Sequence, residues 1–327
     1  MSYPSAYYDE AQRVIDKRRF DNSLEENRRA QEINDKLPAA AELVEQLAGT
    51  IDKLAKIILD RDENVAQRVE KLKEENLSMQ DKLAELLTKN GYPADYLDEI
   101  YTCQKCKDTG IGENGRCECF HELLRQIAAK KLSESLPIGL STFDSFELKY
   151  YSDIKDPKLG GLSPRNIMEQ NLRSCEKYAE NFHLPYESVF MSGGTGLGKT
   201  HLSLAIAKKV IEKEYSVVYG SVPDLLRRIE TAHFDRREDD ADVIFTVKEC
   251  DLLVLDDLGA EFSTQFYIST LYDIINTRLN FGRPTIVSTN LTSEELVQRY
   301  TDRIASRLLS MKRMLFVGSD IRVSKRS

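Results

Sequence analysis

The sequence lacks the patterns that would place a chain in a membrane or on a repetitive scaffold. None of its apolar runs approaches the roughly 20 residues that a membrane-spanning helix needs. Its first residues, MSYPSAYYDEAQRV, show no basic stretch followed by an apolar one. It contains no internal repeat and no low-complexity tract. These absences predict a cytoplasmic protein without a membrane partner.

An excess of positive charge is also missing. Lys and Arg number 46 against 54 Asp and Glu, so the formal net charge is -8. This balance argues against nucleic-acid binding over the whole surface, although a local basic groove remains compatible with it. The chain has 327 residues, of which 41% are hydrophobic. That length is enough for two or three domains, because one domain usually takes about 100–200 residues.

Glycine is nearly absent from residues 6–90, where Gly49 is the only one. Pro38 separates a first helix from a longer one, because proline is tolerated near helix starts and not inside helices. The longer helix ends at Asn90-Gly91. Its apolar residues follow alternating steps of three and four, with Asn76 filling the gap, at Val65, Val69, Leu72, Met79, Leu83 and Leu86. Such a seam is typical of helix–helix packing. It predicts a self-contained hairpin or coiled-coil dimer, or a docking surface for a larger partner.

Four of the six cysteines are clustered in the sequence. The four are Cys103, Cys106, Cys117 and Cys119. In a reducing compartment, clustered thiols are interpreted as metal ligands before disulfides, and four soft ligands on a short segment suit tetrahedral Zn²⁺. His121 is an alternative ligand, because the second cysteine pair is unusually close. Free or redox-active cysteines are the other interpretation, while Cys175 and Cys250 are expected in the core.

From about residue 141 onward, strand patterns alternate with helix patterns. The expected strands are residues 188–192, 216–220, 252–256 and 285–289, and the expected helices are residues 200–213, 223–232 and 265–280. A separate helix is expected at residues 122–135. This alternation predicts an α/β fold with a parallel sheet flanked by helices.

A phosphate loop is the strongest signal in the sequence. Residues 193–200 read GGTGLGKT and match the pattern G-x-x-x-x-G-K-[ST]. The glycines allow backbone N–H groups to surround phosphates, Lys199 is expected to reach the β- and γ-phosphates of ATP, and the Thr200 hydroxyl is expected to bind Mg²⁺. An apolar strand precedes the loop, and a helix that favours anions at its start follows it. The predicted nucleotide-binding residues are Gly193, Gly194, Thr195, Gly196, Leu197, Gly198, Lys199 and Thr200.

Polar residues at the ends of later strands complete the expected site. The apolar run DLLVLDD ends in Asp256, expected beside the metal, and Asp257, expected to orient or deprotonate the attacking water. Many P-loop ATPases of this type carry Glu at the position of Asp257. The shorter Asp side chain is expected to affect the hydrolysis rate more than nucleotide binding. The strand at residues 285–289 leads into Asn290, which suits either a γ-phosphate sensor or the closure of a turn.

Three arginines follow these strands. Arg303 and Arg307 lie four residues apart and therefore share one face of an expected helix. Such a face either presents an arginine to the ATP of a neighbouring subunit, where it stabilises transition-state charge, or is simply solvated. Arg322, near the C-terminus, is expected to fold back onto the phosphates of its own chain.

The order of GGTGLGKT, LLVLDDLGAE, STN, DRIASRL and GSDIR resembles the AAA+ ATPases of the DnaC/DnaI helicase-loader group, relatives of the initiator DnaA and of the IstB-like transposition ATPases. The stretch STFDSF at residues 141–146 resembles the lead-in to their AAA+ core. The resemblance covers roughly residues 141–326. It implies Asn290 as sensor 1, Arg307 rather than Arg303 as the arginine finger, and Arg322 as sensor 2. It also implies an N-terminal, zinc-containing region that binds a helicase.

Together these patterns predict four segments. They are a coiled-coil-like partner-binding region at residues 1–100, a zinc knuckle at 101–121, a helix and linker at 122–140, and an AAA+ ATPase domain at 141–327. The leading hypothesis is a loader of a replicative DNA helicase that binds ATP, Mg²⁺, Zn²⁺ and single-stranded DNA, self-associates through the AAA+ domain, and hydrolyses ATP slowly unless oligomerisation or DNA stimulates it. A transposition accessory ATPase and a nucleotide-gated adaptor with little hydrolysis are the alternatives.

Single-stranded DNA has one candidate contact region, residues 222–237. It offers basic side chains for phosphates and one aromatic ring for stacking: Arg227, Arg228, Arg236, Arg237 and Phe234. A solvated amphipathic helix explains the same pattern.

Overall fold

The computed structural model describes residues 3–59, 64–113, 115–133, 141–235 and 243–324. The chain divides into two compact units, one of residues 12–117 and the other of residues 1–11 and 118–327. Among the described residues, no helix combines the length and the apolar character needed to cross a membrane.

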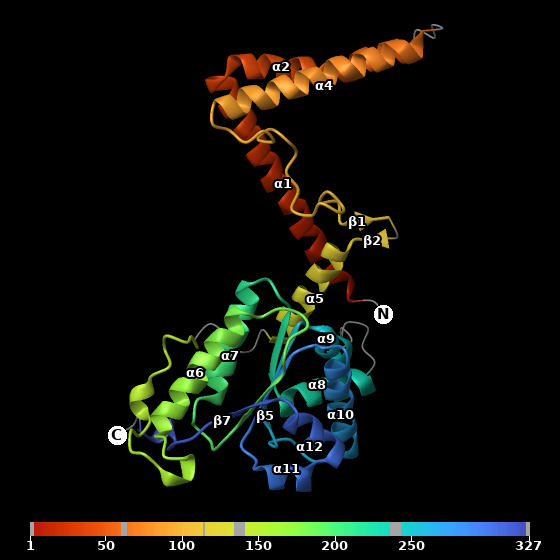
Figure 1. Ribbon diagram of the computed structural model, residues 1–327. Helices are drawn as coiled ribbons and strands as arrows, with labels where there is room; N and C mark the ends of the chain where they lie inside the picture. Colours follow the sequence, from red (N-terminus) through yellow and green to blue (C-terminus); the bar gives the residue numbers. More distant parts are fainter. Residues whose placement is uncertain (1–2, 60–63, 114, 134–140, 236–242, 325–327) are drawn as a thin grey trace. The chain divides into compact units, whose positions relative to one another are not determined.

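Helices dominate the N-terminal part of the chain (Figure 1). They are α1 (Ser5–Lys36), α2 (Pro38–Ala48), α3 (Thr50–Leu59) and α4 (Val65–Lys89), and the short strands β1 (Ile111–Gly112) and β2 (Gly115–Arg116) follow. Pro38 is the first residue of α2, so the predicted boundary is confirmed. The prediction of one uninterrupted helix after Pro38 is wrong. Gly49 separates α2 from α3, because glycine is a poor helix former.

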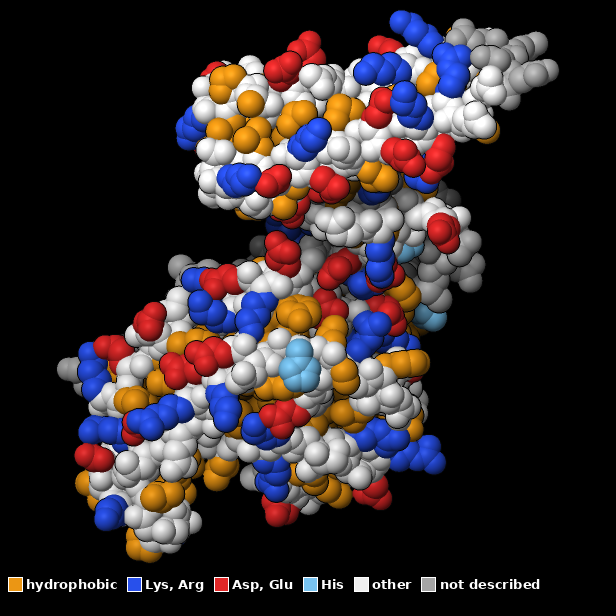
Figure 2. Space-filling view, turned by 45° about the horizontal axis from the view of Figure 1, so that its top comes forward, with side chains coloured by type: hydrophobic (Ala, Val, Ile, Leu, Met, Phe, Trp, Pro, Cys, Tyr) orange, Lys and Arg blue, Asp and Glu red, His pale blue; other side chains and the backbone are white. Residues whose placement is uncertain are grey.

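Helices α2 and α3 both pack along α4 and form a hairpin with it. Leu72 is buried within this hairpin, and the other residues of the predicted seam are partly buried. The hairpin nevertheless leaves apolar side chains in solvent. Ile51 and Ile58 of α3 are 76% and 57% exposed, and Figure 2 shows hydrophobic side chains among charged ones over the hairpin.

The C-terminal unit is built on a five-stranded sheet in which every neighbouring pair is parallel. Its strands are β3 (Val189–Ser192), β4 (Val217–Ser221), β5 (Leu252–Leu258), β6 (Thr285–Thr289) and β7 (Lys312–Leu315), in the spatial order β4-β5-β6-β3-β7. The phosphate-loop strand β3 therefore lies beside β6, and β6 separates it from β5. Since all five strands point the same way, their carboxyl ends meet at one edge.

Helices cover both faces of this sheet (Figure 1). The elements are α5 (Glu118–Ser133), α6 (Pro164–Glu180), α7 (Lys199–Glu212), α8 (Val222–Asp235), α9 (Val243–Glu249), α10 (Gln265–Asn280), α11 (Ser293–Arg299), α12 (Asp302–Leu309) and α13 (Ile321–Ser324), with short 3-10 turns η2 (Leu148–Tyr150) and η3 (Pro157–Leu159). Side chains alternate along each strand. Val254 faces a core shared with α6 and α7, whereas Leu253 and Leu255 face a core shared with α8, α9, α10 and α12.

The predicted fold class, a parallel sheet flanked by helices after an N-terminal helical region, is confirmed. Some boundaries differ. Helix α5 begins at Glu118, four residues before the predicted residue 122, because an acidic residue in the first turn favours a helix start. Strand β5 runs two residues beyond Asp256. The elements α6, α9, α11 and β7 were not predicted.

Candidate functional site

The loop between β3 and α7 surrounds the ammonium group of Lys199. Its Nζ donates to the carbonyl oxygens of Gly193 and Gly194 and to Oδ1 of Asn290, each at 2.6 Å. Lys199 is only 5% exposed, and burial lowers the pKa of its ammonium group against the opposing effect of nearby carboxylates. A buried ammonium ion is stabilised by neighbouring negative charge, so the loop suits an anionic ligand.

Two glycines of the loop allow close packing that a side chain would prevent. Gly198 has a φ of +88°, and an added Cβ would lie 2.7 Å from a ring carbon of Phe146. Gly196 has a φ of +69°, and its Cβ would lie 1.8 Å from Oδ1 of Asp320. The N–H of Ile321 donates to the Gly196 carbonyl oxygen at 3.1 Å. The loop is thus held between the aromatic lead-in and the C-terminal segment.

A β-bulge sets the two acidic side chains at the end of β5. The register with β6 shifts between Leu255 and Leu258, and Asp257 adopts a φ of +57°, a conformation that Asp tolerates better than most residues. Bulges re-aim side chains. Asp256 accepts the Thr200 hydroxyl at 2.9 Å through Oδ2. Hydroxyl and carboxylate oxygens are the ligands that Mg²⁺ prefers, and these two lie together.

A cavity of about 260 Å³ lies at this edge of the sheet. Of the predicted site residues, Lys199, Thr200, Asp257, Asn290 and Arg322 all line it. They come from α7, from the ends of β5 and β6, and from the C-terminal segment. Burial, and next the adjacent carboxylate of the same bulge, raise the pKa of Asp257. Four further predicted residues, Thr195–Gly198 of the phosphate loop, line the same cavity, so the structure brings nine of the predicted residues to one hollow.

An aromatic wall on the same cavity was missed by the sequence reasoning. Phe146, Tyr150 and Tyr151 line it. The rings of Phe146 and Tyr151 stack with centroids 5.8 Å apart, and the Tyr151 hydroxyl donates to the carbonyl oxygen of Leu197 at 2.9 Å. A planar base could lie against such rings. The STFDSF stretch was the available signal, because Phe146 is its last residue.

Arg307 does not line this cavity. Its Nε and Nη2 donate to Oδ1 of Asn276 on α10 at 2.9 and 2.7 Å, and its guanidinium lies over the ring of Tyr272 at 4.8 Å. Arg303 is exposed on the same helix, α12. Within one chain, neither arginine belongs to the hollow that holds Lys199.

The basic segment forms helix α8, and part of its charge is paired. Arg227 bonds to Asp224 at 2.6 Å, and Arg228 donates to the carbonyl oxygen of Leu132 at 2.9 Å. Phe234 is 66% exposed, with the Phe266 ring centroid 5.8 Å from its own. The two remaining candidates, Arg236 and Arg237, lie outside the described residues.

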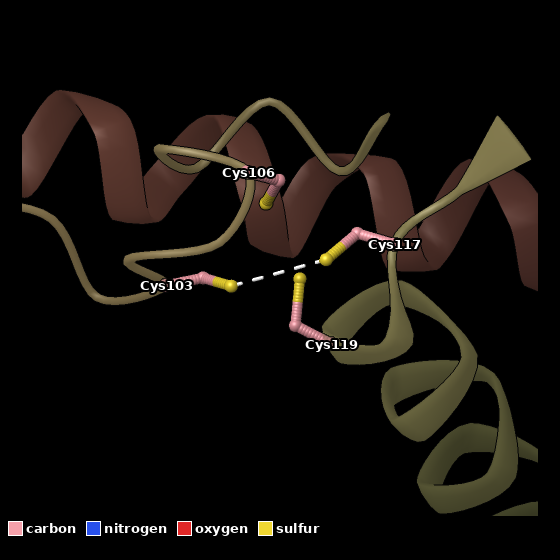
Figure 3. A group of neighbouring side chains, drawn as sticks. All are labelled: Cys103, Cys106, Cys117 and Cys119. Carbon is pink, nitrogen blue, oxygen red and sulfur yellow. Dashed lines mark hydrogen bonds between the residues drawn. The ribbon is translucent and has the colours of Figure 1, made fainter. Parts of the chain in front are cut away.

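The four clustered cysteines point toward one another (Figure 3). The sulfur atoms of Cys103, Cys106, Cys117 and Cys119 all lie within 4.8 Å of one another. The Sγ atoms of Cys103 and Cys117 are 3.9 Å apart, and tetrahedral bonds of about 2.3 Å to Zn²⁺ would place two sulfurs about 3.8 Å apart. The donor set fits a zinc ion. His121, the alternative ligand, is exposed and is not part of this group.

Asp108 supports the first cysteine pair. It is 1% exposed, and its carboxylate accepts the N–H groups of Thr102 and Cys103 at 2.7 and 2.8 Å. The side-chain amide of Asn22, on α1, donates to the same carboxylate at 2.9 Å. One buried acid therefore ties the cysteine turn to a helix.

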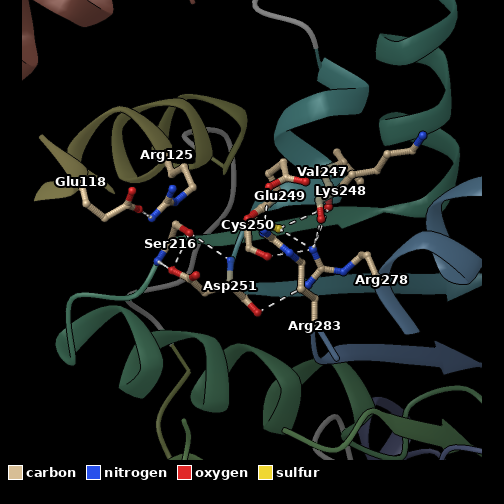
Figure 4. A network of polar contacts seen from close by, with 10 residues as sticks. All are labelled: Glu118, Arg125, Ser216, Val247, Lys248, Glu249, Cys250, Asp251, Arg278 and Arg283. Carbon is tan, nitrogen blue, oxygen red and sulfur yellow. Dashed lines mark hydrogen bonds and ion pairs between the residues drawn. The ribbon is translucent and has the colours of Figure 1, made fainter. Parts of the chain in front are cut away.

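A buried arginine lies at the amino ends of β5 and β6, away from the nucleotide site at their carboxyl ends (Figure 4). Arg278, fully buried on α10, donates to the carbonyl oxygens of Val247, Cys250 and Pro284 at 3.0, 2.8 and 2.7 Å. These carbonyls precede β5 and β6, so the network anchors the strands whose far ends carry the acidic and amide side chains. Cys250 is buried here, as expected of a core residue, and so is Cys175.

A parallel sheet whose strand β3 runs into GGTGLGKT, whose strand β5 carries Asp256 near its end, and whose strand β6 leads into Asn290, defines a P-loop ATP-binding protein. The family model described as IstB-like ATP binding protein matches residues 141–325. More than half of the chain is covered, and the chain belongs to this family.

The predicted resemblance to helicase loaders is confirmed by the curated relatives. The replicative helicase loader DnaC of Escherichia coli (strain K12) is 26% identical over 137 residues, which are 42% of this chain and 56% of DnaC. The replicative helicase loader DnaI of Bacillus subtilis (strain 168) is 30% identical over 146 residues, 42% of this chain and 46% of DnaI. The chain thus spans about half the length of these relatives.

Solved structures include similar chains. The crystal structure of the DnaC helicase loader has a TM-score of 0.46 and 23% sequence identity, and covers 55% of this chain and 98% of that one. The crystal structure of DnaI has a TM-score of 0.44 and 22% identity, with 56% and 91% covered.

Proposed function

We propose that this chain is an ATP-dependent loader of a replicative DNA helicase. The convergence of Lys199, Asp257, Asn290 and Arg322 on one cavity carries the ATP-dependent part of the proposal. The similarity to DnaC and DnaI, both named replicative helicase loaders, supports the loading part. ATP would place its phosphates on the loop at residues 193–200 and its base near the aromatic wall.

Each residue of the site has a proposed task. Thr200 and Asp256 would hold Mg²⁺, which supplies positive charge to the phosphate oxygens. Lys199 binds phosphate oxygens in place of the loop carbonyls it now contacts. Asp257, re-aimed by the bulge, orients the attacking water, and Asn290 donates its amide toward the same place.

Two arginines would stabilise the negative charge that develops on the phosphates in the transition state, one from the same chain and one from a neighbouring chain. Arg322 lines the cavity and acts on the phosphates of its own chain. Arg307 lies on a different surface, held by Asn276 and Tyr272, and would serve the ATP of a neighbouring subunit. This division requires self-association through residues 141–327 and predicts slow hydrolysis by an isolated chain.

The N-terminal part would bind the helicase. Residues 1–100 form the partner-binding region, the cysteines at 101–121 hold a structural Zn²⁺, and residues 122–140 connect them to the ATPase domain at 141–327. Helix α8 contacts single-stranded DNA through its basic residues and Phe234. The chain itself would act in the cytoplasm.

The proposal is tested with the purified full chain and the replicative helicase of its own cell. We expect a complex on size-exclusion chromatography, and ATP turnover that rises when single-stranded DNA is added. A chain that binds no helicase under either condition contradicts the loader assignment.

A transposition accessory ATPase is the second candidate, favoured by the description of the matching family model as IstB-like. Such a protein would prefer duplex over single-stranded DNA and would bind a transposase. A nucleotide-gated adaptor is the third, favoured by Asp257, whose side chain is one methylene shorter than the Glu that many related ATPases carry at this place. Absence of turnover with any DNA would select the adaptor.

A further inference from the structure

A groove of about 950 Å³ lies in the N-terminal unit, lined by α1, α2 and the turn at residues 96–99. Its apolar lining includes the buried Ile33, the half-buried Ala41 and Leu97, which form its floor, and the exposed Ala30. The two alanines leave space between the helices, since a larger side chain at either place would fill it. Figure 1 shows α1 and α2 meeting at an angle at this end of the unit. The volume has room for several side chains rather than one.

The rim of this acidic groove is negatively charged. Its carboxylates are those of Glu26, Asp35, Glu42, Glu45, Asp98 and Glu99, and no Lys or Arg is among the lining residues that the structure describes. The nearby basic residues of α1 form ion pairs with glutamates that do not line the groove. Arg28 and Arg29 pair with Glu25 at 2.7 and 2.8 Å, and Lys36 pairs with Glu32 at 2.8 Å.

We propose that the acidic groove binds an amphipathic helix of a partner protein whose apolar stripe is flanked by Lys and Arg. An apolar floor between two helices is the surface on which a third helix buries such a stripe. The surrounding carboxylates favour a basic helix, fix its orientation and speed its association. The identity of the partner rests on the proposed function: the helix belongs to the helicase.

Peptides test the groove directly. Two synthetic helical peptides share one leucine stripe, the first flanked by lysines and the second by glutamates, and each is titrated into the full chain by fluorescence anisotropy. The lysine-flanked peptide should bind at least about tenfold more tightly, and its affinity should fall as salt rises. Equal binding of the two peptides would overturn the proposal.

Variants test whether the lysine-flanked peptide binds in the groove. Ala41→Arg fills the floor, and the double variant Glu42→Lys with Glu45→Lys reverses the rim; each should weaken the lysine-flanked peptide about tenfold or more. The matched control, Glu74→Lys with Asp81→Lys, makes the same charge change on exposed positions of α4, outside the groove. It should leave binding within about twofold. The double rim variant changes exposed side chains, and its circular dichroism should match wild type.

The same variants are then tested against the helicase. Loss of helicase binding in the groove variants alone supports the proposal. Equal helicase binding by groove variants and wild type overturns it while the proposed function stands. A wild-type chain that binds no helicase contradicts the proposed function, and the peptide titration still decides the groove. Concentration-dependent dimers that the groove variants abolish would make a second copy the occupant and the proposal wrong.

Discussion

The phosphate-loop site and the cysteine cluster gather their residues in different ways. The first draws side chains from the loop before α7, from the ends of β5 and β6, and from the C-terminal segment, all far apart in the sequence. The second takes its four thiols from one short segment, in which β1 and β2 have two residues each. A buried sheet positions the first site, whereas a turn, Asp108 and the proposed metal position the second. Loss of a residue should therefore change chemistry in the first and local structure in the second.

The largest effect on nucleotide binding is expected at the phosphate loop. Lys199→Ala removes a cation whose hydrogen bonds to phosphate are worth about 1.5–3 kcal/mol each, so ATP affinity should fall at least about 100-fold. The thermal unfolding of the sheet should change little. Isothermal titration with ATP measures the affinity, and Lys209→Ala, an exposed lysine on the same helix, is the control. Unchanged ATP affinity in Lys199→Ala would remove the phosphate-loop assignment.

A second large effect separates the two arginines. Arg307→Ala should keep ATP affinity and reduce hydrolysis about 1,000-fold, because an arginine finger acts in the transition state. Mixing this variant with Lys199→Ala protein should partly restore turnover, since one chain keeps the finger and the other keeps the site. If no mixture recovers activity, Arg307 has no role in a neighbouring site.

Loss of a cysteine from the cluster should change metal content and local stability and leave nucleotide binding unchanged. Cys106→Ser should lower zinc from about one ion per chain to nearly none and lower the melting temperature of the N-terminal unit, while ATP affinity stays normal. Metal analysis and circular dichroism check both results. Cys175→Ala, which removes an isolated core thiol, should retain the zinc. If wild-type protein purified without chelator contains no zinc, the zinc assignment is wrong and the four thiols are interpreted as free or redox-active.

A smaller effect probes the hydrophobic core of the N-terminal unit. Leu87 is fully buried and packs with Ile33 and Ala40. Leu87→Ala should reduce the free energy of unfolding of this unit by about 2–4 kcal/mol. Leu77→Ala, at a position that is 52% exposed, should cost less than about 0.5 kcal/mol. Equal melting curves for the two variants would show that the hairpin is not packed as described.

The smallest effect concerns pH. Burial and then Asp256 raise the pKa of Asp257 above its ordinary value of 3.8. A carboxyl whose pKa is higher in the folded than in the unfolded chain stabilises the fold below the unfolded pKa, and this contribution disappears as pH rises through the folded pKa. Asp257→Asn should therefore raise the melting temperature at neutral pH and lose this advantage in acid. Melting curves of wild type and of this variant at neutral and at acid pH check the prediction, and an equal difference at both would contradict it.

Much of the nucleotide site could be predicted because its motifs are local. The GGTGLGKT loop requires glycines and a lysine at fixed spacing, and the strand before Asp256 is a continuous apolar run. Strand β7 escaped prediction because it begins with Lys312 and Arg313 and lies at the sheet edge, where one side needs no partner strand. Its pairing with β3 is non-local and leaves no pattern within the strand itself.

Features that depend on contacts between distant parts of the chain could not be predicted from the sequence. The aromatic wall forms only when Phe146 and Tyr151 fold against Gly198. The acidic groove exists because α1 and α2 meet around small side chains, and alanine spacing within one helix does not reveal a second helix. The bulge at Asp257 depends on its register with β6.

The central claim, ATP-dependent helicase loading, is tested most directly on closed circular single-stranded DNA. The full chain, the helicase of its own cell and ATP are mixed with the circle, and the helicase that remains on the DNA after gel filtration is measured. We predict that helicase is retained only when the chain and ATP are both present, and that Lys199→Ala protein fails. Equal retention without the chain, or with Lys199→Ala in its place, would contradict the account.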